Sequence, residues 1–422
     1  MQFKMKIKLV TFAPHPNFGT CLQSYALNKV LRDMGHDVEF IYNGREKPPR
    51  GQLFYIKKVT KKIVKFFLSS IFLRRLKKLY TKDRNADSTP LNILTLPNNY
   101  LRYIISYLPF YDKVYKYLKC RTLQWKKVYS FTFEDGNYKM KRLYCRKQYK
   151  KVVKDADLFI TGSDQIWNPY CGGFNPMMFL EFAGDKKRIA YSSSISRPFI
   201  PEPLKERYKC DLNKFRHIAV REQKSVELLS NLLGRNDIKL VVDPTYLLSS
   251  KEWEDFAENR VIEFELPKNY IFCYFVGDRY DFFNKMVEEV KKMTGINNVI
   301  TLECYNRDLN YGGGRLYKDA GPYEWVYLLK HASYVCMDSF HATVFALKFH
   351  KEFVHALKSA EEGAKSQNTR IFDILGRYNL LYKIYDRESN DWFKTINYTE
   401  VDNYLDSDIK DSIEFLNYEV HN

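Results

Sequence analysis

Apolar strand-like runs alternate with helical patterns along most of this 422-residue chain, in two consecutive series. The strand-like runs of the first series lie at 7–12, 37–42, 156–161, 188–193, 217–220 and 239–242. Those of the second series, which begins at Trp253, lie at 270–276, 298–302, 333–337 and 352–355. The clearest helical patterns lie at 20–34, 222–233, 282–293, 322–331 and 340–348. Such alternation is typical of parallel sheets with crossover helices. We therefore predict an α/β fold of two Rossmann-like domains that face a cleft.

A basic segment interrupts the first series. Residues 45–151 hold 28 Lys and Arg but 6 Asp and Glu, so the chain's net charge of +18 arises in this segment. We predict three parts: an N-terminal Rossmann-like domain (1–44 and 152–250), a basic, aromatic-rich helical insertion (45–151), and a C-terminal Rossmann-like domain with C-terminal helices (251–422). Residues 357–368 have the composition of a loop.

The insertion contains a basic amphipathic pattern. Ile56, Val59, Ile63 and Phe66 recur at helical spacing. The opposite side carries the lysines Lys57, Lys58, Lys61, Lys62 and Lys65. Such a helix suits an anionic membrane surface. Two other interpretations are a helical pair packed on the body of the protein and a nucleic-acid surface. We favour the membrane, and we expect no nucleic-acid partner because no recognised binding motif accompanies the charge.

Cysteine spacing and hydropathy indicate the compartment. The eight cysteines form no CxxC pair, so neither a zinc site nor a disulfide framework is expected. The apolar runs are shorter than the roughly 18 to 20 residues that cross a bilayer, and the N-terminus lacks the pattern of a signal peptide. We expect a cytoplasmic protein without a bound metal.

The first strand leads into HPNFGTCLQ, where His15 and Asn17 could touch a ligand. Gly19 permits a tight turn, and Thr20 with Gln23 predicts a capping box for the next helix. A helix N-terminus can bind an anion, although this segment alone slightly favours an ordinary strand–turn–helix.

A second motif, FITGSDQIWNP, places Asp164 just after a strand. Ligands bind at the carboxyl ends of strands in open α/β sheets, where Asp164 could act as a general base. Its alternative is a cap for the next segment. Gln165, Trp167 and Asn168 are residue types that suit a sugar, although an isolated Trp is more often a core residue.

Two further motifs also begin where strands end. Arg221 in VREQ has a planar guanidinium that suits a carboxylate or phosphate, or a salt bridge to Glu222. In YVCMDSFHATV, Ser339 and the first helical amides predict an anion nest, with Asp338 beside them. His341 lies in the first helical turn and could supply a proton; the alternatives are plain capping and packing.

Together these motifs resemble the polysaccharide pyruvyl transferase family. The matching segments are 17–41, 159–169, 188–196, 220–229, 241–248, 321–326 and 333–354. The resemblance implies a two-domain fold like that of the GT-B glycosyltransferases. It also implies an active site with an acidic residue, two arginines and a histidine. Asp164 matches the acidic residue, Arg221 the first arginine and His341 the histidine. The second arginine position holds Ser339 in this chain. Either the helix amides and Ser339 bind the phosphate instead, or another cation enters from elsewhere, for which Lys348 and His350 are candidates.

The implied reaction transfers pyruvate from phosphoenolpyruvate onto a sugar as a ketal and releases phosphate, without a cofactor. In it His341 and Asp164 are catalytic, Arg221, Ser339 and Asp338 bind the donor, and Asn17, Gln165, Trp167 and Asn168 bind the acceptor. We expect that acceptor to be a sugar such as galactose, modified as a 4,6-ketal. It would belong to a polyprenyl-diphosphate-linked oligosaccharide of surface or capsular polysaccharide synthesis, reached at the inner face of the membrane. The alternatives are a GT-B-like glycosyltransferase that uses a nucleotide sugar and a non-catalytic binding protein that works through 45–151.

Overall fold

The computed structural model describes residues 4–12, 16–42, 122–143, 146–171, 174–258, 265–303, 308–358 and 368–421. Contacts divide the chain into one unit of 1–42 with 119–422 and a second unit of 43–118. The second unit lies outside the described residues. The predicted membrane-contact residues fall within it: Lys57, Lys58, Lys61, Lys62, Lys65 and Phe66.

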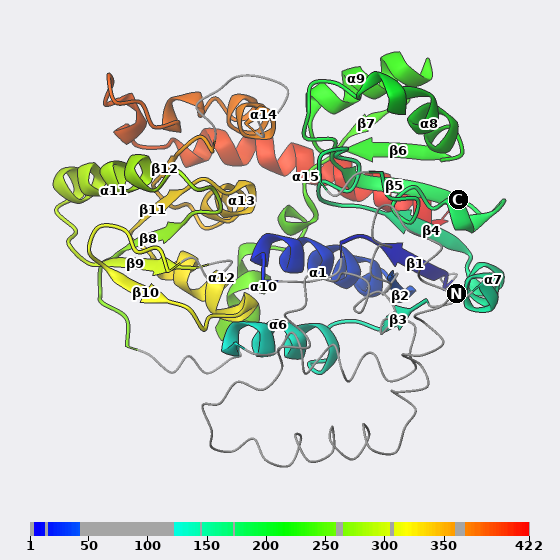
Figure 1. Cartoon of the computed structure of the whole chain (residues 1–422), viewed down its shortest axis with the longest axis horizontal. Coiled ribbons are helices and arrows are strands. Elements are labelled where there is room, and N and C mark those ends of the chain that lie inside the picture. The colour runs from blue at the N-terminus through cyan, green and yellow to red at the C-terminus, as the bar shows by residue number, and fades with distance from the viewer. Residues whose placement is uncertain are drawn as a thin grey trace, which may run out of the picture. The chain divides into compact units, whose positions relative to one another are not determined.

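A seven-stranded parallel sheet forms the first domain (Figure 1), in the order β3-β2-β1-β4-β5-β6-β7. Its strands are β1 (Lys6–Val10), β2 (Asp37–Tyr42), β3 (Met140–Arg142), β4 (Leu158–Thr161), β5 (Arg188–Ser193), β6 (His217–Val220) and β7 (Lys239–Leu240). The helices are α1 (Phe18–Asp33), α6 (Leu123–Phe133), α7 (Arg146–Asp155), α8 (Glu202–Leu212) and α9 (Gln223–Leu233), with the 3-10 turns η1 (Glu181–Ala183) and η2 (Pro244–Tyr246). Strands β4 and β5 are buried along their whole length, as covered parallel sheets require.

A five-stranded parallel sheet forms the second domain, in the order β10-β9-β8-β11-β12. Its strands are β8 (Ile271–Tyr274), β9 (Val299–Leu302), β10 (Arg315–Tyr317), β11 (Tyr334–Met337) and β12 (Phe353–His355). The helices are α10 (Ser250–Glu258), α11 (Tyr280–Thr294), α12 (Pro322–His331), α13 (Phe340–Lys348), α14 (Thr369–Arg377) and α15 (Tyr398–His421), with η3 (Leu381–Lys383) and η4 (Asp391–Phe393). Both sheets reverse strand order beside their first strand, as doubly wound sheets do. The predicted fold class is confirmed.

Two groups of contacts join the domains. Phe18 of α1 lies in one apolar cluster with Trp253 and Trp325 of the second series, and its ring centroid is 6.2 Å from that of Tyr274. Helix α15 begins in the second domain, yet the Ser412 hydroxyl accepts a hydrogen bond from the Val242 amide of the first at 2.9 Å. Figure 1 shows α15 in red, running from the elements of one sheet to those of the other.

The predicted insertion, 45–151, is divided in the structure. Its C-terminal part belongs to the first domain, because β3 pairs in parallel with β2 and extends the sheet. Val128 and Phe131 of α6 are buried in the same apolar cluster as Phe18. Short strands such as β3, with charged residues and one buried position, carry too little periodicity to be found from sequence.

Candidate functional site

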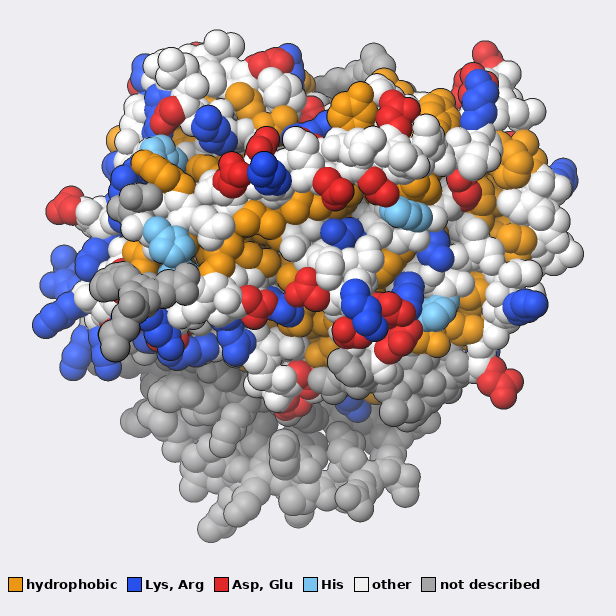
Figure 2. Space-filling view, turned by 180° about the vertical axis from the view of Figure 1, so that it is seen from behind, with side chains coloured by type: hydrophobic (Ala, Val, Ile, Leu, Met, Phe, Trp, Pro, Cys, Tyr) orange, Lys and Arg blue, Asp and Glu red, His pale blue; other side chains and the backbone are white. Residues whose placement is uncertain are grey.

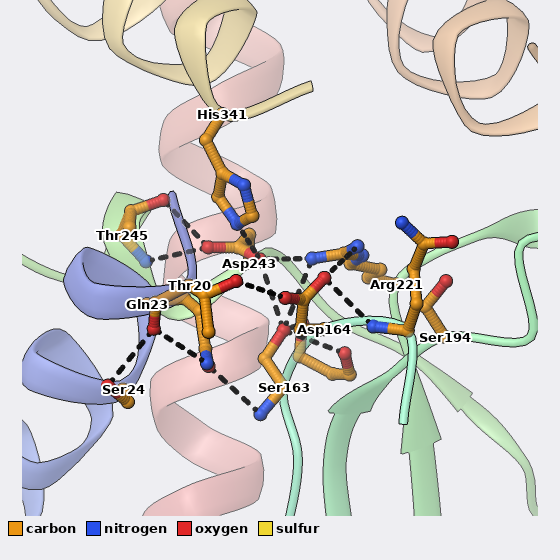
Figure 3. A network of polar contacts seen from close by, with 12 residues as sticks. Thr20, Gln23, Ser24, Ser163, Asp164, Ser194, Arg221, Asp243, Thr245 and His341 are labelled. Carbon is orange, nitrogen blue, oxygen red and sulfur yellow. Dashed lines mark hydrogen bonds and ion pairs between the residues drawn. The ribbon is translucent and has the colours of Figure 1, made fainter. Parts of the chain in front are cut away.

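The switch points of the two sheets lie where β1 adjoins β4 and where β8 adjoins β11. The carboxyl end of β4 is followed by Asp164, and that of β11 by Asp338 and Ser339. Ligands of open α/β sheets bind at such points, because the flanking loops diverge there. The structure brings residues from both switch points into one polar network (Figure 3).

Asp164 is held at this edge by its own backbone and by the neighbouring helix. It adopts the left-handed region with φ of 72° and is 6% exposed. One carboxylate oxygen accepts from the Gln165 amide at 2.8 Å and lies 3.3 Å from Arg221 Nη2; the other accepts from the Thr20 hydroxyl at 3.0 Å. Burial raises its pKa, but Arg221, His341 and Arg370 outweigh burial and lower the pKa below its usual value. Asp164 is therefore ionised at neutral pH.

The predicted capping box of Thr20 and Gln23 is wrong. The helix begins earlier, with Asn17 at the N-cap and no side-chain capping bond. Thr20 instead donates to Asp164, and the Gln23 side chain accepts from the Ser163 amide at 3.2 Å. Both side chains thus tie α1 to the loop after β4 rather than closing their own helix.

Arg221 follows β6 and is 5% exposed. It donates to Asp243 at 2.7 Å, to Asp164 and to Glu222 at 3.3 Å each, and to the Ser163 hydroxyl at 3.4 Å. The two interpretations of Arg221 are therefore not exclusive, since it lies in the site and also pairs with Glu222.

Asp243 is the centre of the network and was not singled out from sequence. One of its oxygens accepts from the Thr245 amide at 3.1 Å and hydroxyl at 2.7 Å, and the other accepts from Arg221 and from Ser163 at 3.1 Å. The second oxygen also lies 3.6 Å from His341 Nε2. Burial raises the pKa of Asp243, but His341 and Arg221 lower it far below its usual value. Its signal in the sequence is its place three positions after the end of strand β7, just as Asp164 lies three positions after the end of β4.

His341 reaches this network from the second domain. It lies in the first turn of α13, is 5% exposed, and points to Asp243 in Figure 3. Its ring packs against Gly19 of α1, where a Cβ atom would lie 2.1 Å from His341 Nδ1. Gly19 therefore serves the close approach of the histidine, and the tight turn predicted for it is not its role.

The other predicted donor residues have structural partners. Ser339 is the N-cap of α13 and its hydroxyl accepts from the Ala342 amide at 3.5 Å. Asp338 is fully buried and accepts from the amides of Val276 at 2.7 Å and Gly277 at 2.6 Å, which fixes the turn after β8. Asp338 therefore supports the switch point, and the prediction that it binds donor is not supported by its contacts.

The predicted acceptor residues separate into three groups. Trp167 is fully buried, stacks on Phe179 with centroids 5.8 Å apart, and donates to the Met178 carbonyl, so the prediction of a sugar platform is wrong. Asn168 is 2% exposed and bonds within its own turn. Gln165 and Asn17 are partly exposed at the edge that carries Asp164 and stay predictions.

Arg370 of α14 is the second buried guanidinium of the site. It is 5% exposed, and its guanidinium carbon lies 5.7 Å from the centroid of the Phe340 ring. The guanidinium carbon of Arg221 is 4.3 Å from the same centroid. The two earlier candidates lie elsewhere: Lys348 donates to the Tyr246 carbonyl, and His350 pairs with Asp402.

In the part of the chain that the structure describes, no group of three or more His, Cys, Asp or Glu is arranged to hold a metal ion. No helix among these residues has the length and apolar character to cross a bilayer. His15 lies outside the described ranges.

The fold and the network together define a two-domain α/β protein with a polar site where the carboxyl ends of its sheets meet. The sequence profile described as polysaccharide pyruvyl transferase matches residues 17–357. The chain therefore belongs to the polysaccharide pyruvyl transferase family, a family of transferases. The resemblance found in its motifs is confirmed.

Solved structures show only distant likeness. A glycosyltransferase from Rickettsia africae has 11% identity, full coverage of both chains and a TM-score of 0.43. The UDP-GlcNAc 2-epimerase from Neisseria meningitidis, bound to UDP-GlcNAc, has 10% identity, coverage of 98% of this chain and 93% of its own, and a TM-score of 0.42. At these scores the likeness carries no argument about function. No curated protein sequence matches the chain.

Proposed function

We propose that this protein transfers pyruvate from phosphoenolpyruvate onto two hydroxyls of one sugar, forming a cyclic ketal and releasing phosphate. The observation that carries the proposal is the single network that joins Asp164, Arg221 and Asp243 of the first domain to His341 of the second. It provides a proton acceptor, a cation and a histidine within one site of a family member.

His341 is proposed as the acid. Its Nε2 lies 3.6 Å from an oxygen of the Asp243 carboxylate, at the centre of the network. In the proposed step the protonated ring gives a proton to the methylene carbon of phosphoenolpyruvate. The adjacent carbon becomes oxocarbenium-like and open to attack.

Asp164 is proposed as the base. The first sugar hydroxyl bonds to the electrophilic carbon, and its proton passes to Asp164. The bond from that carbon to the phosphate oxygen then breaks with both electrons on oxygen. The second hydroxyl closes the ketal, and its proton leaves on phosphate. The proton on Asp164 balances the one that His341 gave. A carboxylate with a lowered pKa is a weak base, so it accepts this proton late, as the new bond forms.

The proposed acceptor is a galactose, modified as a 4,6-ketal, in a polyprenyl-diphosphate-linked oligosaccharide of surface or capsular polysaccharide synthesis.

A basic surface of the protein supports a location at the inner face of the membrane. Arg146, Lys150, Lys154 and Lys186 line a depression of about 660 Å³ whose other lining residues are Tyr149, Val153 and Phe182. Figure 2 shows Lys and Arg side chains gathered at the margin where α7 lies. Apolar and cationic groups side by side suit an anionic lipid surface.

The proposed function is tested by phosphate release from phosphoenolpyruvate in the presence of a galactoside. His341→Ala should lower the rate between about 10²- and 10⁴-fold, the range of acid–base contributions. His350→Ala is the matched control, because His350 lies just after α13 and is exposed on the surface. Equal rates for wild type and His341→Ala would contradict the proposed role of His341.

A further inference from the structure

Arg221, the arginine that the family resemblance assigns to the donor, is occupied by protein groups. A guanidinium has five N–H donors, and Arg221 directs four hydrogen bonds to Asp243, Asp164, Glu222 and Ser163. Three of these partners are carboxylates that offset its charge. One N–H donor of Arg221 is left, so Arg221 could bind two oxygens of a substrate anion only by giving up a contact to Ser163 or to one of the carboxylates.

Arg370 is in the opposite situation. Among the residues that the structure describes, it forms no ion pair with a carboxylate, and its Nε has no hydrogen-bond partner. Its terminal nitrogens face the side-chain carboxamide of Gln165, whose oxygen accepts from Nη1 at 2.7 Å and Nη2 at 3.2 Å in the orientation that suits both groups. A buried cation supported by one neutral amide is costly to fold.

The surroundings increase this cost. Arg370 is the second residue of α14, and the positive end of a helix dipole disfavours a cation. Burial first, and then Arg221, lower the pKa of Arg370 to about 10, although the charges of Asp164 and Glu222 offset part of this effect. Arg370 is therefore still charged at neutral pH. Nearby His355 is fully buried with no partner for either ring nitrogen within the described ranges. Burial, together with the charges of Lys358 and Arg370, lowers the pKa of His355 to about 3.

Arg370 also faces the reacting groups. It contributes to the lowered pKa of Asp164, and it shares the Phe340 ring with Arg221. Phe340 immediately precedes His341 in the chain. The planar guanidinium of Arg370 can bind two oxygens of a carboxylate or phosphate at once from this position.

We propose that Arg370 is the donor-binding cation of this protein, receiving an oxyanion of phosphoenolpyruvate, while Arg221 positions Asp164 and Asp243. The inference rests on the proposed function for the identity of the donor. Arg370 would then supply the positive charge that the family places at the position of Ser339. It lies on α14, 31 positions further along the chain.

The experiment measures binding to the full chain by calorimetry and by ligand-induced shift of the unfolding temperature. The probes are phosphoenolpyruvate, inorganic phosphate, pyruvate and UDP. The variants are Arg370→Gln and Arg370→Lys. The control is Arg377→Gln on the same helix, where the arginine is paired with Asp408.

Arg370→Gln should weaken phosphoenolpyruvate binding at least tenfold, with partial recovery in Arg370→Lys and none of this loss in Arg377→Gln. Without ligand, Arg370→Gln should unfold at the same or a higher temperature than wild type, because it removes a buried charge with which no described carboxylate forms an ion pair. A purely structural arginine would instead lower that temperature and leave affinity unchanged. If inorganic phosphate raises the unfolding temperature of wild type but not of Arg370→Gln, Arg370 binds the phosphate group of the donor. If pyruvate has this effect instead, Arg370 binds the carboxylate.

The outcomes separate this inference from the proposed function. Equal phosphoenolpyruvate affinity in wild type and Arg370→Gln overturns the inference and leaves the proposed function standing. If wild type binds UDP and none of the other probes, and Arg370→Gln loses this binding, Arg370 is supported as an anion-binding residue. Phosphoenolpyruvate is then overturned as the donor. Binding of none of the probes by wild type overturns both.

Discussion

Asp243 is the residue on which the arrangement of the site depends. Its carboxylate receives Arg221 and Ser163 from the first domain and lies 3.6 Å from His341 of the second. This carboxylate therefore holds the arginine and also lies beside the histidine that is proposed as the acid.

Asp243→Asn should lower kcat between about 10²- and 10⁴-fold while phosphoenolpyruvate still binds, because the amide removes the negative charge that faces both Arg221 and His341. Steady-state kinetics with unfolding curves measures this. Asp211→Asn is a control for the loss of a buried carboxylate away from the site, since Asp211 pairs with Arg207 and Lys214. An unchanged kcat in Asp243→Asn would contradict the assignment.

His355 gives the fold a predictable sensitivity to acid. Its pKa is about 3 when folded and near 6.5 in the unfolded chain, so between these values the unfolded state binds the extra proton. Stability is therefore complete above pH 6.5 and is lost as the pH falls, by up to about 1.4 kcal/mol per pH unit. Denaturant unfolding from pH 7 to pH 5 should show a smaller loss for His355→Leu than for wild type. Parallel pH profiles would show that His355 is not buried in neutral form.

Helices α1 and α13 meet at the site, and they can approach closely because Gly19 of α1 has no side chain. The His341 ring occupies the space that a Cβ of Gly19 would need. This contact between elements of two domains aims the histidine at Asp243.

Gly19→Ala should displace His341 and lower kcat about 10²-fold or more, since acid–base steps depend on position. Gly376→Ala is the control: it lies inside α14, and its added methyl group would meet no atom closer than 3.9 Å. That variant should keep full activity and gain up to about 1 kcal/mol of stability from helix propensity. Full activity of Gly19→Ala would contradict the packing described.

Sequence patterns were sufficient for elements and residues that are defined locally. The bounds of β5, β6, α12 and α13 follow directly from apolar runs and periodicity. Asp164, Arg221 and His341 could be identified because each follows the end of a strand.

Features that depend on distant partners could not be predicted. The sequence context of Thr20 predicts a helix cap, but in the structure Thr20 bonds to Asp164, 144 positions away. The context of Trp167 predicts a sugar-binding surface, but in the structure Phe179 and Phe215 pack against its ring. Arg370 follows a segment with loop composition and has no local pattern, so only the packing of α14 beside Phe340 reveals it.

At the scale of the whole molecule, the unequal distribution of charge is the feature to test. The basic residues of α7 surround apolar side chains on one surface. The polar network lies instead at the carboxyl ends of the strands. Binding to a membrane and pyruvyl transfer should therefore be separable by mutation.

Wild-type protein should float with anionic vesicles, and this binding should weaken with salt because surface charges are screened. Lys150→Gln with Lys154→Gln should reduce binding about fivefold for each lysine, from about 1 kcal/mol per basic residue. The control is Lys224→Gln with Lys251→Gln, two exposed lysines on other helices. Equal flotation with neutral vesicles would count against an electrostatic membrane surface.

Mass spectrometry of a galactoside acceptor incubated with the protein and phosphoenolpyruvate is the sharpest test of pyruvyl transfer. The acceptor should become heavier by one pyruvate less one water as phosphate is released, and Asp164→Asn and His341→Ala should abolish this product. An acceptor of unchanged mass with phosphoenolpyruvate, but heavier by one hexose with a nucleotide sugar, would contradict pyruvyl transfer as the activity of this site.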